Sequence, residues 1–136
     1  MVLVTVALHA VGLALLLRAI KREDTTEKMH HVSALSLRAL AFTMLVLGAL
    51  FLLHGIEIWL FALVYVVIGA LPDMSAALYY STISYSTVGY DDAQMPEPWR
   101  LLGAIESING VILLGWSTAF LFEMVSHIER SRDPRD

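Results

Sequence analysis

A run of hydroxyl-bearing residues that ends in glycine, tyrosine and acid has the composition of a cation-binding loop. It occupies residues 81–92, reads STISYSTVGYDD and lies between long apolar stretches. A pore that strips water from a cation must offer oxygen ligands instead, and backbone carbonyls with one threonine hydroxyl can do this. The run is too polar to cross a bilayer as a helix. The chemistry it predicts is therefore cation coordination inside a loop.

The same run resembles the pore loop and selectivity filter of the tetrameric potassium channels, whose usual signature is Thr-Val-Gly-Tyr-Gly-Asp. This sequence keeps the signature at Thr87, Val88, Gly89, Tyr90 and Asp92. It departs at Asp91, where the family carries its second glycine. The resemblance implies an all-α membrane protein in which four copies of a span–pore helix–filter loop–span module surround one axis and conduct K⁺. The alternative is a re-entrant or interfacial loop that only shares these letters.

The resemblance also implies how the filter residues share the coordination of K⁺. Thr87 would offer its hydroxyl and its carbonyl at the inner end of the filter. Carbonyls from Val88, Gly89 and Tyr90 would follow further out. Successive carbonyls point at one axis only if the backbone alternates in hand, and glycine makes such a conformation easy at Gly89.

Two adjacent acids, Asp91 and Asp92, are expected at the outer mouth of the filter. Aspartate tolerates positive φ better than most residues, so Asp91 can take the place of the glycine in the filter. A ring of such acids concentrates cations and often binds divalent ions. A nonselective or divalent-binding cation channel on the same scaffold is therefore the first alternative to K⁺ conduction. A non-conducting membrane subunit is the second.

A short helix over residues 73–85 is expected to position the filter. Pro72 suits a helix start, and Asp73 can cap the first backbone amides. About three turns are too short to cross a bilayer, so this helix should enter the membrane and return. Its tyrosines can pack behind the filter, and by the resemblance its C-terminal end points at the pore centre, where its partial negative charge favours cations. These tyrosines are Tyr79, Tyr80 and Tyr85.

Three apolar stretches can supply membrane spans. Basic residues follow residues 2–19 rather than precede them, which favours a retained, peripheral first helix over a cleaved signal peptide. Residues 35–71 are far more than the roughly 20 that a span needs. We favour one long outer helix there over two short spans that turn near Gly55. The third stretch, residues 99–127, begins at an interfacial tryptophan and is expected to form the inner helix.

The basic residues orient these spans. They cluster after the first stretch and at the C-terminal end, at Arg18, Lys21, Arg22, Lys28, Arg38, Arg130, Arg132 and Arg135. No Lys or Arg lies between Leu71 and Trp99. The positive-inside rule then places the N-terminus and the filter outside, and the linker and C-terminus in the cytoplasm. We expect a multi-pass inner- or plasma-membrane protein with a first helix and linker (1–34), a pore domain (35–127, filter 86–92) and a tail (128–136).

Ionisable side chains in membrane spans usually face protein or water rather than lipid. His54 and Glu57 are three residues apart and share one helical face. A pair buried between helices is favoured there over a role in ion passage or gating. His9, in the first stretch, is expected to be a packed or lipid-facing neutral residue.

The third stretch should line the cavity below the filter. Glu106 and Asn109 share one of its faces. Asn109 is a candidate cavity residue, whereas contact with ions and pairing with the pore helix or a neighbouring subunit are equally expected for Glu106. Gly110 and Gly115 are candidate gating hinges because glycine weakens a helix locally. Close helix packing is the alternative for both glycines.

Composition excludes several other classes of protein. The 136 residues are 57% hydrophobic with a mean hydropathy of +0.67, so a lipid bilayer is the expected surrounding. A formal net charge of −4 without a basic face argues against a nucleic-acid partner. The absence of cysteine excludes disulfides and thiolate metal sites. The spans carry no zinc-protease or serine-hydrolase motif and no paired aspartates, so we expect neither an enzyme nor a cofactor other than the permeant cations.

The size of the chain and its arginines bear on assembly and gating. At 136 residues one copy is too small to enclose a pore, so a closed ring is needed, and we expect a homotetramer. No span carries arginine at every third position, which argues against a voltage sensor.

Overall fold

The computed structural model describes residues 1–24, 37–89, 93 and 95–130 of the chain. Helices account for nearly all of these residues, and no strand occurs among them. Their bounds are α1 (Val2–Asp24), α2 (Leu37–Val67), α3 (Met74–Tyr85), η2 (Glu97–Trp99) and α4 (Arg100–Arg130). The all-α architecture predicted from the sequence is therefore confirmed. Most of the expected linker, the end of the tail and the outer part of the filter lie outside the described residues.

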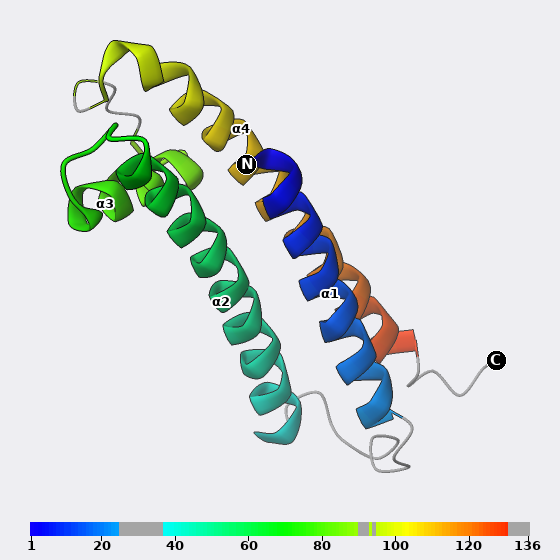
Figure 1. The fold of residues 1–136 in the computed structure, drawn as a ribbon. Helices are drawn as coiled ribbons and strands as arrows, with labels where there is room; N and C mark the ends of the chain where they lie inside the picture. The colour runs from blue at the N-terminus through cyan, green and yellow to red at the C-terminus, as the bar shows by residue number, and fades with distance from the viewer. Residues whose placement is uncertain (25–36, 90–92, 94, 131–136) are drawn as a thin grey trace.

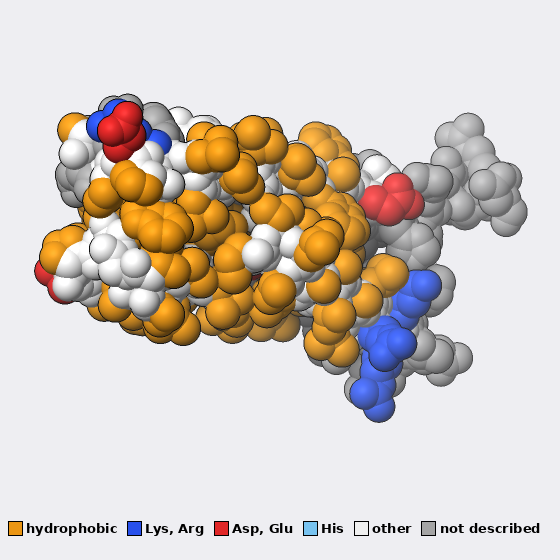
Figure 2. Space-filling view, turned by 45° about the horizontal axis from the view of Figure 1, so that its top comes forward, with side chains coloured by type: hydrophobic (Ala, Val, Ile, Leu, Met, Phe, Trp, Pro, Cys, Tyr) orange, Lys and Arg blue, Asp and Glu red, His pale blue; other side chains and the backbone are white. Residues whose placement is uncertain are grey.

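Among the described helices, three are long and apolar enough to cross a membrane. The apolar parts are Val2–Arg22, Leu40–Val67 and Glu97–Ser126, with mean hydropathies of 2.1, 2.1 and 1.5. Figure 2 shows hydrophobic side chains along most of one face of the molecule, with a larger group of basic side chains at one end and a smaller one, beside an acidic side chain, at the other. The chain is therefore a multi-pass membrane protein, as its composition predicts.

The helices form one bundle (Figure 1). α2 runs antiparallel to α1 and α4, and α1 and α4 lie side by side. α3 contacts both α2 and α4 at one end of the bundle. α1 contacts the same two helices along the rest of their length. The short helix and the first span thus share the space between the two long helices.

The second apolar stretch is a single helix, which decides between the two alternatives that the sequence left open. α2 ends at Val67 rather than at residue 71 because the chain turns at Gly69, whose φ is +70°. The Gly69 amide donates to the Val66 carbonyl at 3.0 Å, and the Ala70 amide donates to the Tyr65 carbonyl at 2.9 Å. This pair of bonds is the Schellman arrangement, in which a left-handed glycine lets the last carbonyls of a helix find donors.

α3 begins where the sequence predicts a cap. Asp73 is extended, with φ −153° and ψ 170°, and its side-chain oxygen accepts from the Ala76 amide at 2.9 Å. Such a cap satisfies one of the amides that a helix start leaves without a partner. The direction in which α3 leaves the loop after α2 is thereby fixed.

The first span is less peripheral within the chain than predicted. Thr5, His9 and Leu13 lie four residues apart on one face of α1, and this face is buried. Thr5 and His9 form side-chain hydrogen bonds to α4 and α2, which a lipid-facing helix would not provide. His9 is therefore packed, which is one of the two expected alternatives, and it does not face lipid.

Two apolar cores lie at the two ends of the bundle, with a polar layer between them. The core around α3 contains Phe61, Tyr65, Tyr80 and Met95, all fully or almost fully buried. The other core joins α1, α2 and α4 and contains Leu13, Val46, Leu50 and Met124. The layer between them holds buried polar side chains from α1, α2, α3 and α4: Thr5, His9, Glu57, Ser81, Glu106, Asn109 and Ser117.

Candidate ion-conduction site

The pore helix leads directly into the predicted filter. α3 ends at Tyr85, and the amide of its C-cap Ser86 donates to the Thr82 carbonyl at 3.1 Å. The Thr87 amide donates to the Ser84 carbonyl at 3.1 Å, so the chain leaves the helix at Thr87. Val88 is 83% exposed in the single chain. A segment that copies of the chain must complete around an axis is expected to be uncovered in this way.

The turn into the filter uses a residue other than the one predicted. Thr87 has φ +57°, whereas the φ of Gly89 does not lie in the positive range that only glycine adopts easily. Left-handed conformation at a β-branched residue stores strain of about 1–3 kcal/mol. Thr87, at the inner end of the predicted filter, is therefore the strained residue. The prediction that Gly89 changes the hand of the backbone is corrected, because Thr87 takes the left-handed conformation instead.

The outer part of the predicted filter and its mouth, Tyr90, Asp91 and Asp92, lie outside the described residues. Their roles as carbonyl ligands and as an acidic ring therefore stay predictions. Among the described residues, Thr87, Val88 and Gly89 follow the end of α3 without interruption.

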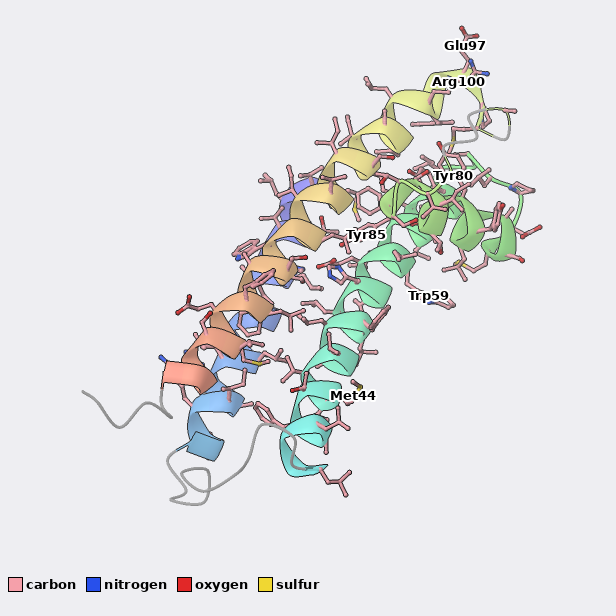
Figure 3. All side chains as sticks on the ribbon, turned by 180° about the vertical axis from the view of Figure 1, so that it is seen from behind. Met44, Trp59, Tyr80, Tyr85, Glu97 and Arg100 are labelled. Carbon is pink, nitrogen blue, oxygen red and sulfur yellow. The ribbon has the colours of Figure 1, made fainter. Side chains whose placement is uncertain are left out.

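A buried carboxylate from α2 holds the last residue of α3. The Tyr85 hydroxyl donates to Oε2 of Glu57, and Tyr85 is only 1% exposed. His54 Nδ1 lies 3.2 Å from the same Oε2 atom, which confirms the predicted His54–Glu57 pair. Figure 3 shows Tyr85 between α2 and α4, immediately before the filter. A carboxylate of α2 therefore fixes the end of α3, from which the predicted filter follows.

A second buried carboxylate, from α4, holds α3 one turn earlier. Hydroxyl groups of Tyr65 and Ser81 both donate to Glu106. Ser81 and Tyr85 are four residues apart, so both contacts lie on the same face of α3. Of the two expectations for Glu106, the structure therefore favours pairing with the pore helix over contact with ions. Together, Glu57 and Glu106 anchor α3 from the two helices that flank it.

Glycines in α4 permit the close approach of α3. A Cβ at Gly110 would lie 2.1 Å from the Tyr85 carbonyl oxygen, and one at Gly103 would lie 2.2 Å from the Tyr80 hydroxyl. The packing alternative thus accounts for Gly110. At Gly115 a Cβ would meet nothing within 4 Å, so its predicted role as a hinge stays open.

Asn109 faces the first span rather than an open side of α4. Its side chain is 2% exposed, and its Nδ2 group donates to the Thr5 hydroxyl at 3.0 Å. Glu106 and Leu113, on the same face, are fully buried. The predicted shared face of α4 exists, but it points into the subunit. A cavity role for Asn109 has no support in this geometry.

His9 is the functional candidate that the sequence analysis missed. Its Nδ1 atom lies 2.9 Å from Oε1 of Glu57, so a residue of α1 joins the group that holds Tyr85. The available signal was the four-residue spacing of Thr5 and His9, which puts two polar side chains on one face of an apolar helix. What the sequence could not show is that this face meets His54 and Glu57.

Comparison with protein families agrees with this geometry. A family model described as an ion channel, Ion_trans_2, matches residues 39–127. The match covers most of α2, all of α3 and the filter, and most of α4, and it excludes α1. No curated protein matches the chain, and no solved structure matches it. Because the matched segment is well over half of the chain, the protein belongs to the ion channel family, as a small potassium-channel-like protein with a further span ahead of the two-span core.

Proposed function

We propose that four copies of this chain surround a common axis and conduct K⁺ through a filter built from Thr87, Val88, Gly89, Tyr90 and Asp91. The observation that carries the proposal is the path of the chain at the end of α3. The helix is docked between two spans, ends at Tyr85 and continues directly into the exposed Thr-Val-Gly segment. A helix that only packed between two spans would not need to lead into an exposed loop of this kind.

The direction of α3 supports cation conduction. A helix carries a partial negative charge at its C-terminal end, and the filter residues follow that end of α3. Four such ends around one axis stabilise a cation that has lost part of its water. The anchors at Glu57 and Glu106 keep this end in place, because each accepts a hydroxyl hydrogen from α3.

The proposed orientation places the filter on the outer side of the inner or plasma membrane and the C-terminus in the cytoplasm. Lys21 and Arg22 lie in the last turn of α1, at the end of the bundle opposite α3. The positive-inside rule favours the cytoplasm for that end.

A second candidate function is conduction without selectivity for K⁺, or with bound divalent ions. It is favoured by one feature of the sequence, Asp91 at the position where the potassium channels carry glycine. A carboxylate at that position adds charge next to the outer ion site, and charged rings attract cations of several kinds. Equal permeabilities for K⁺ and Na⁺ would select this candidate.

The proposal is tested by ion flux from liposomes that contain the purified protein. We expect K⁺ efflux from liposomes with wild-type protein and at least a several-fold slower efflux with Thr87→Ala, which lacks the hydroxyl ligand at the inner end. Thr43→Ala, in the second turn of α2, is the matched control and should conduct like wild type. A stable monomer in mild detergent without flux would indicate a non-conducting subunit instead.

A further inference from the structure

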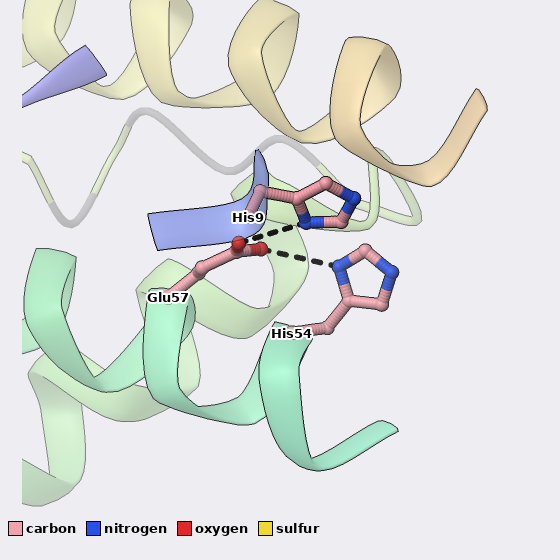
Figure 4. A group of neighbouring side chains, drawn as sticks. All are labelled: His9, His54 and Glu57. Atoms are coloured by element: carbon pink, nitrogen blue, oxygen red, sulfur yellow. Dashed lines mark hydrogen bonds and ion pairs between the residues drawn. The ribbon is translucent and has the colours of Figure 1, made fainter. Parts of the chain in front are cut away.

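Three ionisable side chains from two spans meet beneath the end of the pore helix (Figure 4). His9 comes from α1, and His54 and Glu57 come from adjacent turns of α2. His9 Nδ1 lies 2.9 Å from Oε1 of Glu57, and His54 Nδ1 lies 3.2 Å from Oε2. The three groups offer two imidazole nitrogens and a carboxylate oxygen that all lie within 4.8 Å of one another.

This donor set and its dimensions fit a divalent transition metal. Two histidines and one glutamate form a known zinc ligand set, with metal–ligand distances of about 2.0–2.2 Å. Ligand atoms of a tetrahedral zinc are then about 3.3 Å apart. His9 Nδ1 and Oε1 of Glu57 are 2.9 Å apart, and all three ligand atoms lie within 4.8 Å of one another, so small side-chain shifts would bring them to that spacing. Three protein ligands leave a fourth position for water or for a nearby hydroxyl. His9 and Glu57 are fully buried, whereas the His54 side chain is 12% exposed, so the cluster reaches the surface at His54.

The hydrogen bonds of Ser117 distinguish an occupied cluster from an empty one. The Ser117 hydroxyl oxygen lies 3.0 Å from His54 Nε2 and 3.3 Å from His9 Nε2. In the empty cluster with neutral histidines, each Nδ1–H donates to Glu57, and both Nε2 atoms need a donor. Ser117 has only one hydrogen to give. In this arrangement one buried nitrogen lacks a partner, unless one imidazole takes a second proton or His54 takes its other tautomer. In that tautomer Nδ1 accepts from the Tyr85 hydroxyl at 2.8 Å, and Nε2–H donates to Ser117.

Metal binding gives both Nε2 atoms a partner without either of these changes. When both Nδ1 atoms bind a metal, both Nε2 atoms carry hydrogen, and the two lone pairs of the Ser117 oxygen can accept both. Histidine ligands usually donate their second N–H to such an acceptor, which fixes the ring and its tautomer. The carboxylate is supported in the same way. With Oε1 of Glu57 toward the metal, Oε2 still accepts from the Tyr85 hydroxyl.

We propose that His9, His54 and Glu57 form a binding site for a divalent transition metal such as Zn²⁺, with Ser117 and Tyr85 as supporting hydrogen-bond partners. The site joins the first span to the outer helix of the pore module, at the level where α3 ends. It goes beyond the proposed conduction, because the filter takes no part in it. The empty alternative is an imidazolium–carboxylate pair that holds no metal.

The test measures metal content and affinity of the full chain, purified in detergent with any affinity tag removed. After treatment with a chelator, wild-type protein is expected to bind one Zn²⁺ per chain in calorimetry and elemental analysis. His9→Ala and Glu57→Gln should abolish this binding. Ser117→Ala should weaken it roughly 10- to 100-fold, as loss of a supporting partner does elsewhere. Co²⁺ in the wild-type site should give the visible absorption of a tetrahedral complex.

Two further variants make the result decisive. His127→Ala removes a histidine that is not one of the three and should retain full binding. If His9→Ala does not fold, His9→Cys keeps a ligand at that position and should bind, with a shift in preference toward softer metals. The proposal is overturned if folded wild-type protein binds no Zn²⁺, or if binding survives Glu57→Gln and follows His30, His31 or His127 instead.

This outcome is independent of conduction. Metal binding is measured in detergent without ion flux, and Thr87→Ala should retain it. Protein that binds Zn²⁺ but passes no K⁺ would contradict the proposed function alone, and conducting protein without the metal site would contradict the present inference alone.

Discussion

Thr87 and Gly110 show how closely single residues set the entrance to the filter. Thr87 takes a left-handed conformation just after α3 ends. Gly110 leaves room for the carbonyl of Tyr85, the last residue of α3. The motif Thr-Val-Gly-Tyr predicts a filter from the sequence because its backbone carbonyls and threonine hydroxyl can act as cation ligands. The strain at Thr87 could not be predicted in this way, because β-branched residues rarely adopt positive φ. The sequence also could not show whether Gly110 allows close helix packing or acts as a gating hinge.

The close contact at Gly110 predicts a strong effect of a single methyl group. Gly110→Ala would put Cβ 2.1 Å from a backbone oxygen, which no side-chain rotation can relieve. We expect the free energy of unfolding in detergent to fall by roughly 1–3 kcal/mol or more. Gly115→Ala is the matched control on the same helix, because a Cβ there meets nothing within 4 Å. Equal stability of the two variants would show that α3 does not lie against α4 at this point.

At the scale of the elements, the short helix is held by its flanking spans rather than by its own length. The carboxylates of Glu57 and Glu106 bind Tyr85 and Ser81 on one face of α3. The bounds of α3 were predictable because Asp73 is a strong helix start and because the filter cannot be helical. The position of α1 was not, since periodicity shows that a helix has a polar face but not which helices this face meets.

One element-scale prediction concerns the anchor at Ser81. Ser81→Ala removes one of two hydroxyl donors to the buried carboxylate of Glu106. Leaving a buried polar group without one of its partners costs roughly 1–3 kcal/mol, so chemical denaturation should show a loss of that size. Ser107→Ala, whose hydroxyl bonds only a carbonyl of its own helix in this structure, should change stability by no more than about 0.5 kcal/mol. A Ser81→Ala variant as stable as Ser107→Ala would refute the anchor.

The start of α3 allows a second prediction at this scale. Asp73→Ala removes the acceptor for the Ala76 amide and should lower the free energy of unfolding by about 1 kcal/mol. Asp73→Asn keeps a capping oxygen and should remain close to wild type. Thermal denaturation of both variants in the same detergent gives the comparison. If Asn and Ala substitutions prove equally destabilising, the charge of Asp73 rather than its capping bond supports the helix.

At the scale of the whole molecule, the proposed filter lies open on the surface of one chain. The filter residues that the structure describes are uncovered, and the exposed surface is largely hydrophobic. Membrane spans and fold class followed from hydropathy and composition, because lipid exposure forces apolar residues onto the outside of a helix. Subunit number and ion preference did not, because they depend on contacts between copies and on small differences in ion-binding energy near Asp91.

The proposed potassium filter is tested most directly by the reversal potential of purified protein in a planar bilayer with K⁺ on one side and Na⁺ on the other. A potassium filter at residues 87–91 predicts a reversal potential near the K⁺ equilibrium value, with Asp91→Gly as selective as wild type or more so. A reversal potential near zero for wild-type protein, reflecting equal permeability to both ions, would contradict the account.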